Sequence, residues 1–374
     1  MRSPLQPGAD IADDDRAPHA FEVVDTAEEA ASLELAPLLV REPLRRFLDE
    51  CGLGDGELEA RRVGDGHSNV TYLIRRGDER FVVRRPPRPP LPPSAHDVLR
   101  EARILRALAG REVAVPAVLA TCDDESVIGA PFYVMEYLDG IVLTAATPPA
   151  FATPEHRHRL GELVVSELVA LHSIDVETGP LSELGRPTGY LERQVRRFAQ
   201  LWERGRTREL AVLDRVTAWL GEHLPHSGRP AVVHGDYRIG NMIFAAQPPA
   251  RVLGILDWEM ATLGDPLADL GYLTAHMAQA QRPANVIRDL QPVTREPGFP
   301  DAAWMTDRYA ELTGADVSEL RWYRVLAIWK SAVFLEQSYQ RFLSGNELDP
   351  WFAELGAGVP DLAEQAWEEA QSRS

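Results

Sequence analysis

The sequence changes its periodicity at Gly140, and this change constrains the fold more than any other feature. Before it, residues 70–85 alternate between apolar and polar side chains on both sides of a turn at 76–79, which predicts a β-hairpin. Residues 131–138 predict a further strand. After it, apolar positions recur with the period of an amphipathic helix over residues 157–172, 190–202 and 320–343. We therefore expect an α+β fold, with a small β-rich N-terminal lobe and a larger helical C-terminal lobe.

The same pattern sets the expected boundaries. Residues 1–35 are polar, acidic and interrupted by proline, so we expect a flexible arm. The N-terminal lobe should then span residues 36–138 and the C-terminal lobe residues 139–374. Within the first lobe, residues 38–51 and 95–108 predict helices, separated from each other by the hairpin and a proline-rich loop.

Composition excludes several classes of protein. The formal net charge of -18 argues against nucleic-acid binding. This charge can serve solubility, or it can attract a cationic substrate. The sequence leaves both interpretations open. The chain has two cysteines, too few for a disulfide framework or a cysteine-based metal site. No apolar run has the length of a membrane span or a secretory signal, so we expect a cytoplasmic protein without a membrane partner. The oligomeric state is not indicated.

The stretch VVHGDYRIGNMIF, residues 232–244, places polar side chains between two short apolar strands expected at 231–233 and 241–244. Asp236 and Asn241 lie five positions apart, and Asp257 follows another apolar strand over 252–256. Carboxylate and amide oxygens suit Mg²⁺ bound with phosphates. An aspartate and an asparagine at this spacing are typical of the kinase catalytic loop. The alternative is that Asp236 and Asn241 are ordinary turn residues.

With the later segment ILDWEMATLGDPLADLGYL, this stretch resembles the aminoglycoside phosphotransferase and choline kinase-like family of small-molecule kinases. The resemblance covers roughly residues 38–343. It implies a bilobal, protein-kinase-like fold, with nucleotide binding in the N-terminal lobe and catalysis in the C-terminal lobe. It also implies that Asp236 is the general base and that Asn241 and Asp257 bind Mg²⁺. The residues implied to support them are His234, Asp265 and Asp269, the last by hydrogen bonds to the loop backbone.

The nucleotide side of the site should begin at GDGHSN, residues 64–69. Gly64 and Gly66 would let backbone N–H groups approach a phosphate, with Ser68 as an additional donor. Asn69 stands where a third glycine would complete the glycine-rich loop of protein kinases. A plain turn is the alternative for this segment.

Arg84 occupies the strand position at which kinases carry a lysine for the α- and β-phosphates. Alternation puts it on the same face as Val82, whereas Arg85 should be a solvated charge. Glu101 lies on the apolar face of its helix and needs a partner there. We expect an Arg84–Glu101 ion pair, with a surface pair between Glu101 and a nearby arginine as the alternative.

The resemblance supplies two further expectations. The backbone between Met135 and Leu138, with Glu136 inside it, should bond adenine. Arg238 should neutralise charge on the phosphoryl group during transfer, with an ordinary surface arginine as the alternative. The expected cofactors are Mg²⁺ and ATP, with GTP left open.

The resemblance implies that the acceptor is a small molecule with a hydroxyl group. Within the family, the sequence is most similar to a subgroup fused to acyl-CoA dehydrogenases in animals, which implies a hydroxyacyl-type acceptor. An anionic acceptor would fit the arginines of the segment 190–209, although a solvated helix face explains them equally well. These arginines are Arg193, Arg196, Arg197, Arg204, Arg206 and Arg208. Two alternatives are an aminoglycoside acceptor and a nucleotide-binding pseudokinase that acts as a regulatory module. Glu259 would face the acceptor in either kinase.

Overall fold

A five-stranded antiparallel sheet forms where the sequence alternates. In spatial order it consists of β3 (Leu58–Val63), β4 (Val70–Arg76), β5 (Glu79–Arg85), β7 (Phe132–Glu136) and β6 (Val118–Cys122). The expected hairpin is confirmed, because β4 and β5 pair with Arg76 opposite Glu79. Gly77 in its turn has a φ of +55°, a conformation that favours glycine.

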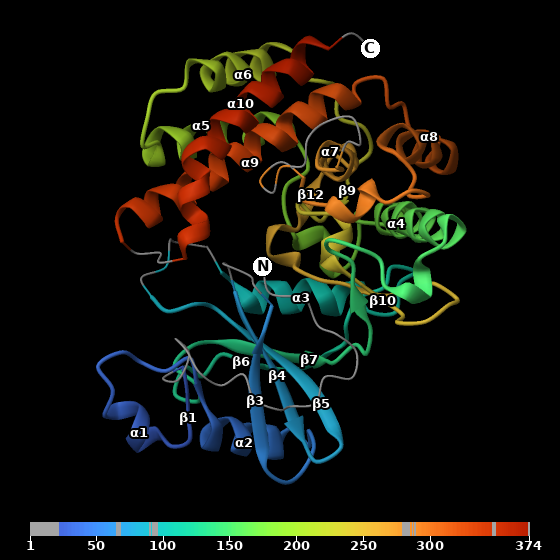
Figure 1. The fold of residues 1–374 in the computed structure, drawn as a ribbon. Helices are drawn as coiled ribbons and strands as arrows, with labels where there is room; N and C mark the ends of the chain where they lie inside the picture. The colour runs from blue at the N-terminus through green and yellow to red at the C-terminus, as the bar shows by residue number, and fades with distance from the viewer. Residues whose placement is uncertain are drawn as a thin grey trace. The chain divides into compact units, whose positions relative to one another are not determined.

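The structure is a computed structural model (Figure 1). It describes residues 22–64, 69–89, 91, 96–278, 285, 287, 289–345 and 349–372.

Helices pack on both faces of this sheet. α2 (Arg41–Glu50) buries Leu44 and Leu48 in a core with the inward side chains of β4 and β5. α3 (Val98–Leu108) begins at Asp97, whose side chain accepts a hydrogen bond from the backbone N–H of Arg100, as N-capping residues do. It packs against β6 and β7. Both helices were expected from their periodicity, over slightly longer ranges.

Arg85 corrects the sequence-based interpretation. Expected to be solvated, it is 2% exposed, and its guanidinium donates hydrogen bonds to the carbonyl oxygens of Leu38, Pro86 and Ile128. Burial lowers the pKa of Arg85 to about 10. Alternation showed that Arg84 and Arg85 face opposite sides of the sheet, but it could not show that both sides are covered.

The segment expected as an acidic arm contains ordered elements near its end. β1 (Val23–Val24) pairs in parallel with β2 (Leu39–Val40), and α1 (Ala27–Ala31) lies between them. Residues 1–21 lie outside the described part of the chain.

The rest of the chain is mainly helical. The three helices expected here are confirmed, and α9 has the expected bounds. The helices are α4 (Pro154–Ser173), α5 (Tyr190–Gly205), α6 (Ala211–Glu222), α7 (Leu267–Ala275), α8 (Ala302–Thr313), α9 (Leu320–Leu343) and α10 (Leu355–Gln371). α9 packs against α5, α7 and α10, and Figure 1 shows α10 running beside it.

Short strands complete the fold. β9 (Ala231–Val233) pairs antiparallel with β12 (Thr262–Gly264). The others are β8 (Ile141–Val142), β10 (Met242–Phe244) and β11 (Val252–Ile255). The chain divides into two compact units, the first of residues up to 110, 114–141 and 253–259, the second of residues 111–113, 142–252 and those from 260 onward. Unlike the expected lobes, the first unit therefore includes the short segment that carries Asp257.

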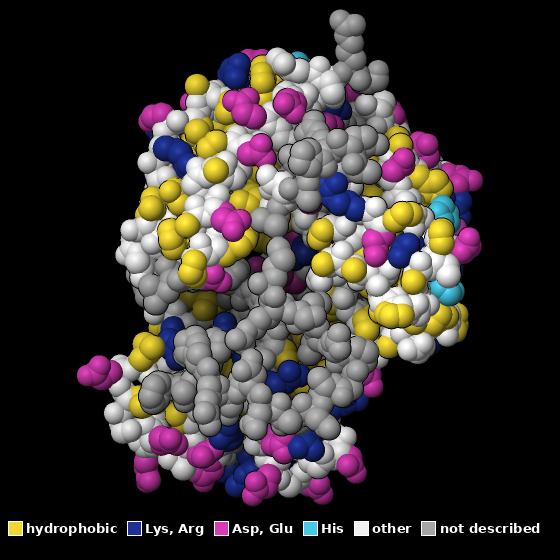
Figure 2. Space-filling view, viewed as in Figure 1, with side chains coloured by type: hydrophobic (Ala, Val, Ile, Leu, Met, Phe, Trp, Pro, Cys, Tyr) yellow, Lys and Arg dark blue, Asp and Glu magenta, His cyan; other side chains and the backbone are white. Residues whose placement is uncertain are grey.

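The surface carries charged side chains of both signs. Where the face shown in Figure 2 belongs to described residues, acidic and basic side chains are interspersed. Among the helices in the described ranges, none is long and apolar enough to cross a membrane.

Candidate active site

The loop between β9 and β10 is held by one buried carboxylate. Asp269, on α7, accepts hydrogen bonds from the backbone N–H groups of His234 (2.6 Å) and Gly235 (2.8 Å). Gly235 has a φ of +86°, and a Cβ there would lie 2.9 Å from Met260, so the position requires glycine. The expectation that Asp269 holds the loop backbone is confirmed.

Asp236 projects from this loop with a side chain that is 23% exposed. Asn241 Nδ2 donates a hydrogen bond to Asp236 Oδ2 (2.8 Å), and Arg238 Nε lies 3.3 Å from Oδ1. Burial alone would raise the pKa of Asp236, but Arg238, the Tyr272 hydroxyl, His234 and Asn241 together lower it. Asp236 is therefore an ionised carboxylate at neutral pH, the form that can accept a proton from a hydroxyl group.

His234 has a local structural role. It is fully buried, and its Nδ1 accepts a hydrogen bond from the backbone N–H of Asp236 (3.2 Å). This bond ties the imidazole ring to the backbone of the loop. His234 therefore orients the residue expected to be the base.

Asn241 lies in the second unit and Asp257 in the first, and their binding of Mg²⁺ stays a prediction. Asn241 uses its amide nitrogen twice, on the backbone oxygen and on Oδ2 of Asp236, which leaves its amide oxygen for a cation. Asp257 Oδ2 accepts no hydrogen bond from the described residues. Carboxylate and amide oxygens are the ligands that Mg²⁺ prefers. The described ranges hold no group of three or more His, Cys, Asp or Glu side chains placed to bind a metal. A bound Mg²⁺ would take further ligands from phosphates and water.

In the first unit, Arg84 joins two carboxylates. Its Nε donates to Glu101 Oε2 (2.9 Å), and its Nη2 donates to Asp257 Oδ1 (2.5 Å). The expected Arg84–Glu101 pair is confirmed. The contact with Asp257, 173 positions along the chain, was not expected.

Glu101 is 1% exposed and also accepts a hydrogen bond from the backbone N–H of Trp258 (3.1 Å). Burial raises the pKa of Glu101, and Arg84 opposes that rise. Burial would lower the pKa of Arg84, but Glu101 and Asp257 raise it above its usual value. Without Arg84, the buried Glu101 carboxyl would favour its protonated form.

We predict strong coupling between Arg84 and Glu101. Arg84→Met or Glu101→Gln should each lower the free energy of unfolding by about 3 kcal/mol, because the first leaves the buried Glu101 carboxylate without its cation and the second removes one of the two carboxylates that bond Arg84. The double variant should cost less than the sum of the two. Urea unfolding of all four proteins measures the coupling, and strict additivity would show that the pair contributes nothing.

Arg84→Lys tests the shape of the cation. A single ammonium cannot reproduce a guanidinium that bonds one carboxylate through Nε and another through Nη2, so we expect lower stability and weaker nucleotide binding. Arg75→Lys is the matched control. Arg75 lies on the neighbouring strand in an exposed pair with Glu59, where the same change should have little effect. Equal effects of the two changes would contradict the bridging role of Arg84.

The glycine-rich segment is only partly described. Gly64 has a φ of +82°, and Gly66 and Ser68 lie outside the described residues. Asn69 is 4% exposed, with Nδ2 donating to Glu259 Oε2 (3.0 Å) and Oδ1 lying 3.2 Å from His96 Nδ1. Contact of this segment with phosphate stays a prediction. Glu259 bonds Asn69 within the first unit, a use that the sequence did not indicate.

Glu136 ends β7, and its backbone N–H donates to the carbonyl oxygen of Ala117 (2.9 Å). The carboxylate of Glu136 accepts a hydrogen bond from the backbone N–H of Ala117 (2.7 Å). Leu138 is half-buried and packs on Gly254, where a Cβ would lie 2.4 Å from Leu138 Cδ1. The binding of adenine by this segment stays a prediction, and the N–H of Glu136 is already used within the unit.

Sequence reasoning missed Gln291, which supports the loop between β9 and β10. Gln291 is 1% exposed; its Oε1 accepts from the N–H of Ile239 (2.9 Å), and its Nε2 donates to the carbonyl oxygen of Leu273 (2.8 Å). It thus ties the loop to α7. A single glutamine in an irregular segment carries no sequence signal for this role.

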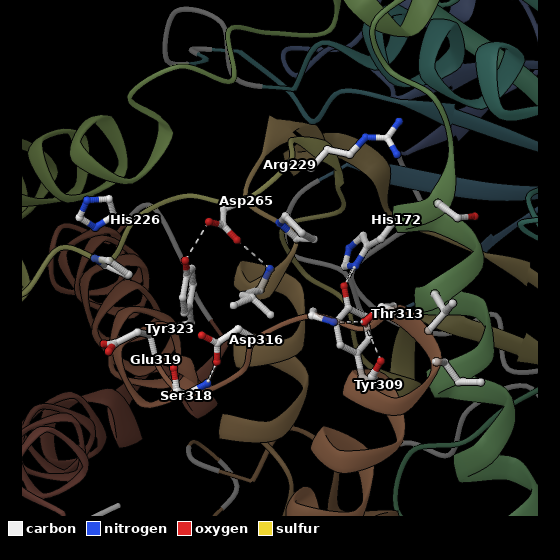
Figure 3. Close-up of a pocket in the computed structure, with 18 of the residues that line it drawn as sticks. His172, His226, Arg229, Asp265, Tyr309, Thr313, Asp316, Ser318, Glu319 and Tyr323 are labelled. Carbon is white, nitrogen blue, oxygen red and sulfur yellow. Dashed lines mark hydrogen bonds between the residues drawn. The ribbon is translucent and has the colours of Figure 1, made fainter.

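A pocket of about 930 Å³ in the second unit is lined in part by His172, Asp265 and Tyr309 (Figure 3). Asp265 accepts hydrogen bonds from the Tyr323 hydroxyl (2.8 Å) and the N–H of Leu267. His172 Nε2 lies 3.3 Å from Asp269 Oδ2, and its Nδ1 lies 2.8 Å from the Tyr309 hydroxyl oxygen. His172 therefore contacts the carboxylate that holds the loop between β9 and β10.

Most arginines of the segment 190–209 have internal partners. Arg208 bonds the buried Glu336 (2.8 Å), Arg206 pairs with Glu203 and Glu209, and Arg193 donates to backbone oxygens. Arg204 bonds Gln200. Only Arg196 and Arg197 have neither a hydrogen bond nor an ion pair with the described part of the chain.

Lys330 is a second residue that sequence reasoning missed. It is the only lysine in the chain, among 39 lysines and arginines, and this was the available signal. It lies on α9, is 8% exposed, and holds its ammonium 4.7 Å from the centre of the Phe198 ring. Burial lowers the pKa of Lys330 to about 8, and Arg197 acts in the same direction, whereas Asp269 and Asp236 oppose the change.

This shift predicts a pH-dependent stability. The folded pKa of about 8 lies below the ordinary 10.5, so between these values the unfolded chain holds more protons. The free energy of unfolding should therefore rise with pH across this window, by up to about 3 kcal/mol. Urea unfolding of the wild type and Lys330→Met from pH 7 to pH 10 measures this contribution. A difference between the two proteins that does not change with pH would contradict it.

Residues 59–311 match the model of the phosphotransferase enzyme family. Mouse acyl-CoA dehydrogenase family member 10 is 35% identical over 316 residues, which cover 84% of this chain and 29% of that protein. Chicken acyl-CoA dehydrogenase family member 11 is 32% identical, covering 87% of this chain and 43% of that protein. The chain thus spans less than half the length of these relatives.

Solved structures share the fold. A provisionally named aminoglycoside phosphotransferase from Ralstonia eutropha has a TM-score of 0.74 and 29% identity, covering 88% of this chain and 98% of that one. A thermostable mutant of aminoglycoside phosphotransferase APH(4)-Ia, in a ternary complex with AMP-PNP and hygromycin B, has a TM-score of 0.58 and 16% identity. It covers 89% of this chain and 100% of that one. These likenesses confirm the expected fold class.

Proposed function

The chain belongs to the phosphotransferase enzyme family, and from this premise we propose that it transfers the γ-phosphoryl group of ATP to a hydroxyl of a small molecule. The observation that carries the proposal is the loop carboxylate Asp236, which is ionised, partly exposed and fixed by Asp269, His234 and Asn241. A residue that only ended a strand would not need three supports.

Asp236 is the general base in this proposal. An alcohol is a poor nucleophile until its proton has an acceptor, and a positioned carboxylate supplies one. Arg238, whose Nε lies 3.3 Å from Asp236 Oδ1, keeps this carboxylate ionised and bears the positive charge that the phosphoryl group needs during transfer.

Arg84 and Glu101 serve the nucleotide. Glu101 orients the guanidinium of Arg84, as a glutamate orients the phosphate-binding lysine of kinases, and Arg84 bonds the phosphates. Asn241 and Asp257 each give an oxygen to Mg²⁺, which neutralises phosphate charge when bound. Gly64 and the residues after it complete the phosphate contacts.

The acceptor is proposed to be of the hydroxyacyl type. The relatives that carry this region are named as acyl-CoA dehydrogenases, which act on acyl groups, so a kinase region beside them suits an acyl substrate with a hydroxyl group. An aminoglycoside is the alternative acceptor that the solved structures suggest.

A second candidate function is that of a nucleotide-binding pseudokinase. It is favoured by one observation: Arg84 replaces the usual lysine and already bonds Asp257, the expected metal ligand. Such a protein would bind Mg²⁺-ATP and regulate a partner without turnover.

A screen of ADP formation separates these functions. The purified chain with Mg²⁺-ATP should be tested against hydroxyacyl-CoAs, free hydroxy acids, aminoglycosides, choline-like amines and sugars. We expect turnover with a hydroxyacyl or hydroxy acid compound. Turnover with aminoglycosides alone would overturn the acceptor proposal, and nucleotide binding without turnover in any class would favour the pseudokinase.

A further inference from the structure

The single lysine of the chain occupies an unusual position. Every other cationic side chain is an arginine, so a lysine at position 330 marks a site where a compact ammonium is needed. Its side chain is buried between α9 and α5, against the ring of Phe198.

Lys330 has no anionic partner in the described part of the chain. No carboxylate there forms an ion pair with it, and no oxygen accepts a hydrogen bond from its ammonium. The ring of Phe198 attracts the charge but accepts none of the N–H bonds in their usual sense. A buried ammonium without acceptors is costly, so such groups normally meet a partner. The described part of the chain supplies no such partner for Lys330.

The helix that carries Lys330, α9, packs against α7, which carries Asp269, the residue that holds the loop between β9 and β10. The charges of Asp236 and Asp269 act on Lys330, and the Tyr272 hydroxyl interacts with both Asp236 and Ser331, the next residue on α9. The charge of Arg197 on α5 also acts on Lys330, and this exposed guanidinium is one of the two unpaired arginines of the helix. Lys330 on α9 and Arg197 on α5 therefore lie on two helices that pack against each other, and neither forms an ion pair within the described part of the chain.

We propose that Lys330, assisted by Arg197, is the residue that recognises the acceptor through a negatively charged oxygen group, so that the acceptor is a hydroxy compound bearing a carboxylate or a phosphate. This inference rests on the proposed function, because it specifies the acceptor of the same site. A polycation such as an aminoglycoside would be repelled by Lys330 and Arg197.

The single lysine makes a direct test possible. Amine-directed acetylation can modify only Lys330 and the N-terminal amine, and peptide mass spectrometry separates the two. The acetylation rate of Lys330 should be measured with a series of hydroxycarboxylates of increasing length, their phosphate esters, and the matched neutral diols. At about ten times its dissociation constant, an anionic probe should slow the reaction about tenfold, whereas the diols should not.

The acetylation rate should also be measured with Mg²⁺-ATP alone, because the phosphates of ATP are negatively charged oxygen groups like those proposed for the acceptor. Protection by Mg²⁺-ATP alone, protection by the diols as strong as by the acids, or no protection by any probe would each overturn the assignment. Protection by the acids without Mg²⁺-ATP supports it. The screen of ADP formation tests the proposed function separately, so a failure of that function can be distinguished from a failure of the role assigned to Lys330.

Variants test the role in turnover. With an anionic acceptor that is phosphorylated, Lys330→Met should lower kcat/KM about 10- to 100-fold through KM of the acceptor, with KM for ATP unchanged. Lys330→Arg should restore part of the loss, and Arg197→Met should lose less than Lys330→Met. Arg196→Met, at an exposed neighbouring arginine, is the matched control and should behave as wild type. An equal loss with anionic and neutral acceptors would contradict charge recognition.

Discussion

Asp236→Asn should reduce phosphoryl transfer to the acceptor by about 10²- to 10⁴-fold, while Mg²⁺-ATP binding stays near that of the wild type. The amide keeps the shape of the carboxylate but cannot take a proton from a hydroxyl. Asn241 and Asp257 are unchanged in this variant, so the proposed magnesium ligands remain. This is a loss of about 3–5 kcal/mol of transition-state stabilisation, the largest that we expect from a single change in the second unit.

Steady-state kinetics and calorimetric titration with Mg²⁺-ATP measure the two halves of this prediction. Asp307→Asn is a matched control, because Asp307 is an exposed aspartate on α8. Turnover in Asp236→Asn equal to that of the control would remove Asp236 from the role of base. Lost nucleotide binding would instead show that the change disturbs more than proton transfer.

Asp257→Asn should abolish most of the Mg²⁺-dependent part of nucleotide binding. A neutral amide is a weaker ligand for a hard cation than a carboxylate, and the loss of charge also leaves Arg84 with Glu101 alone. We choose asparagine first because Asp257 has a φ of +67°. Asparagine adopts this left-handed conformation readily, whereas alanine there would cost about 1 kcal/mol or more of stability.

Calorimetric titration of ATP with and without Mg²⁺ checks this prediction, with urea unfolding to verify the fold. Asp257→Ala should behave in the same way once its lower stability is taken into account. Asp123→Asn, at an exposed position after β6, is the control. An ATP affinity that depends on Mg²⁺ as strongly in Asp257→Asn as in the wild type would exclude Asp257 as a metal ligand.

Periodicity was enough to predict the parts of the site that depend on one element. A period of two placed Arg84 on a particular face of β5, and the helical period placed Glu101 on the inner face of α3. The two faces meet, so their ion pair could be predicted. The helix α9 was predicted with its bounds because its periodic pattern runs over 24 residues.

Contacts between distant segments could not be predicted in this way. The bond between Arg84 and Asp257 depends on residues 253–259 packing in the first unit, which no local pattern encodes. The burial of Arg85 was not predicted, because the alternation of side chains along a strand shows which face a residue lies on but not whether that face is covered. Gln291 and Lys330 were missed because a single polar residue within a helix or loop has no periodicity of its own.

Transfer of labelled phosphate tests the central claim most directly. The chain should be incubated with Mg²⁺, ATP labelled with ¹⁸O in its γ-phosphoryl group, and the series of hydroxyacyl and hydroxy acid compounds, and the products analysed by mass spectrometry. We predict a phosphorylated acceptor that carries the label, formed only with Mg²⁺ and lost in Asp236→Asn. Tight binding of Mg²⁺-ATP with no labelled acceptor from any class of hydroxyl compound would contradict the account and favour a nucleotide-binding module.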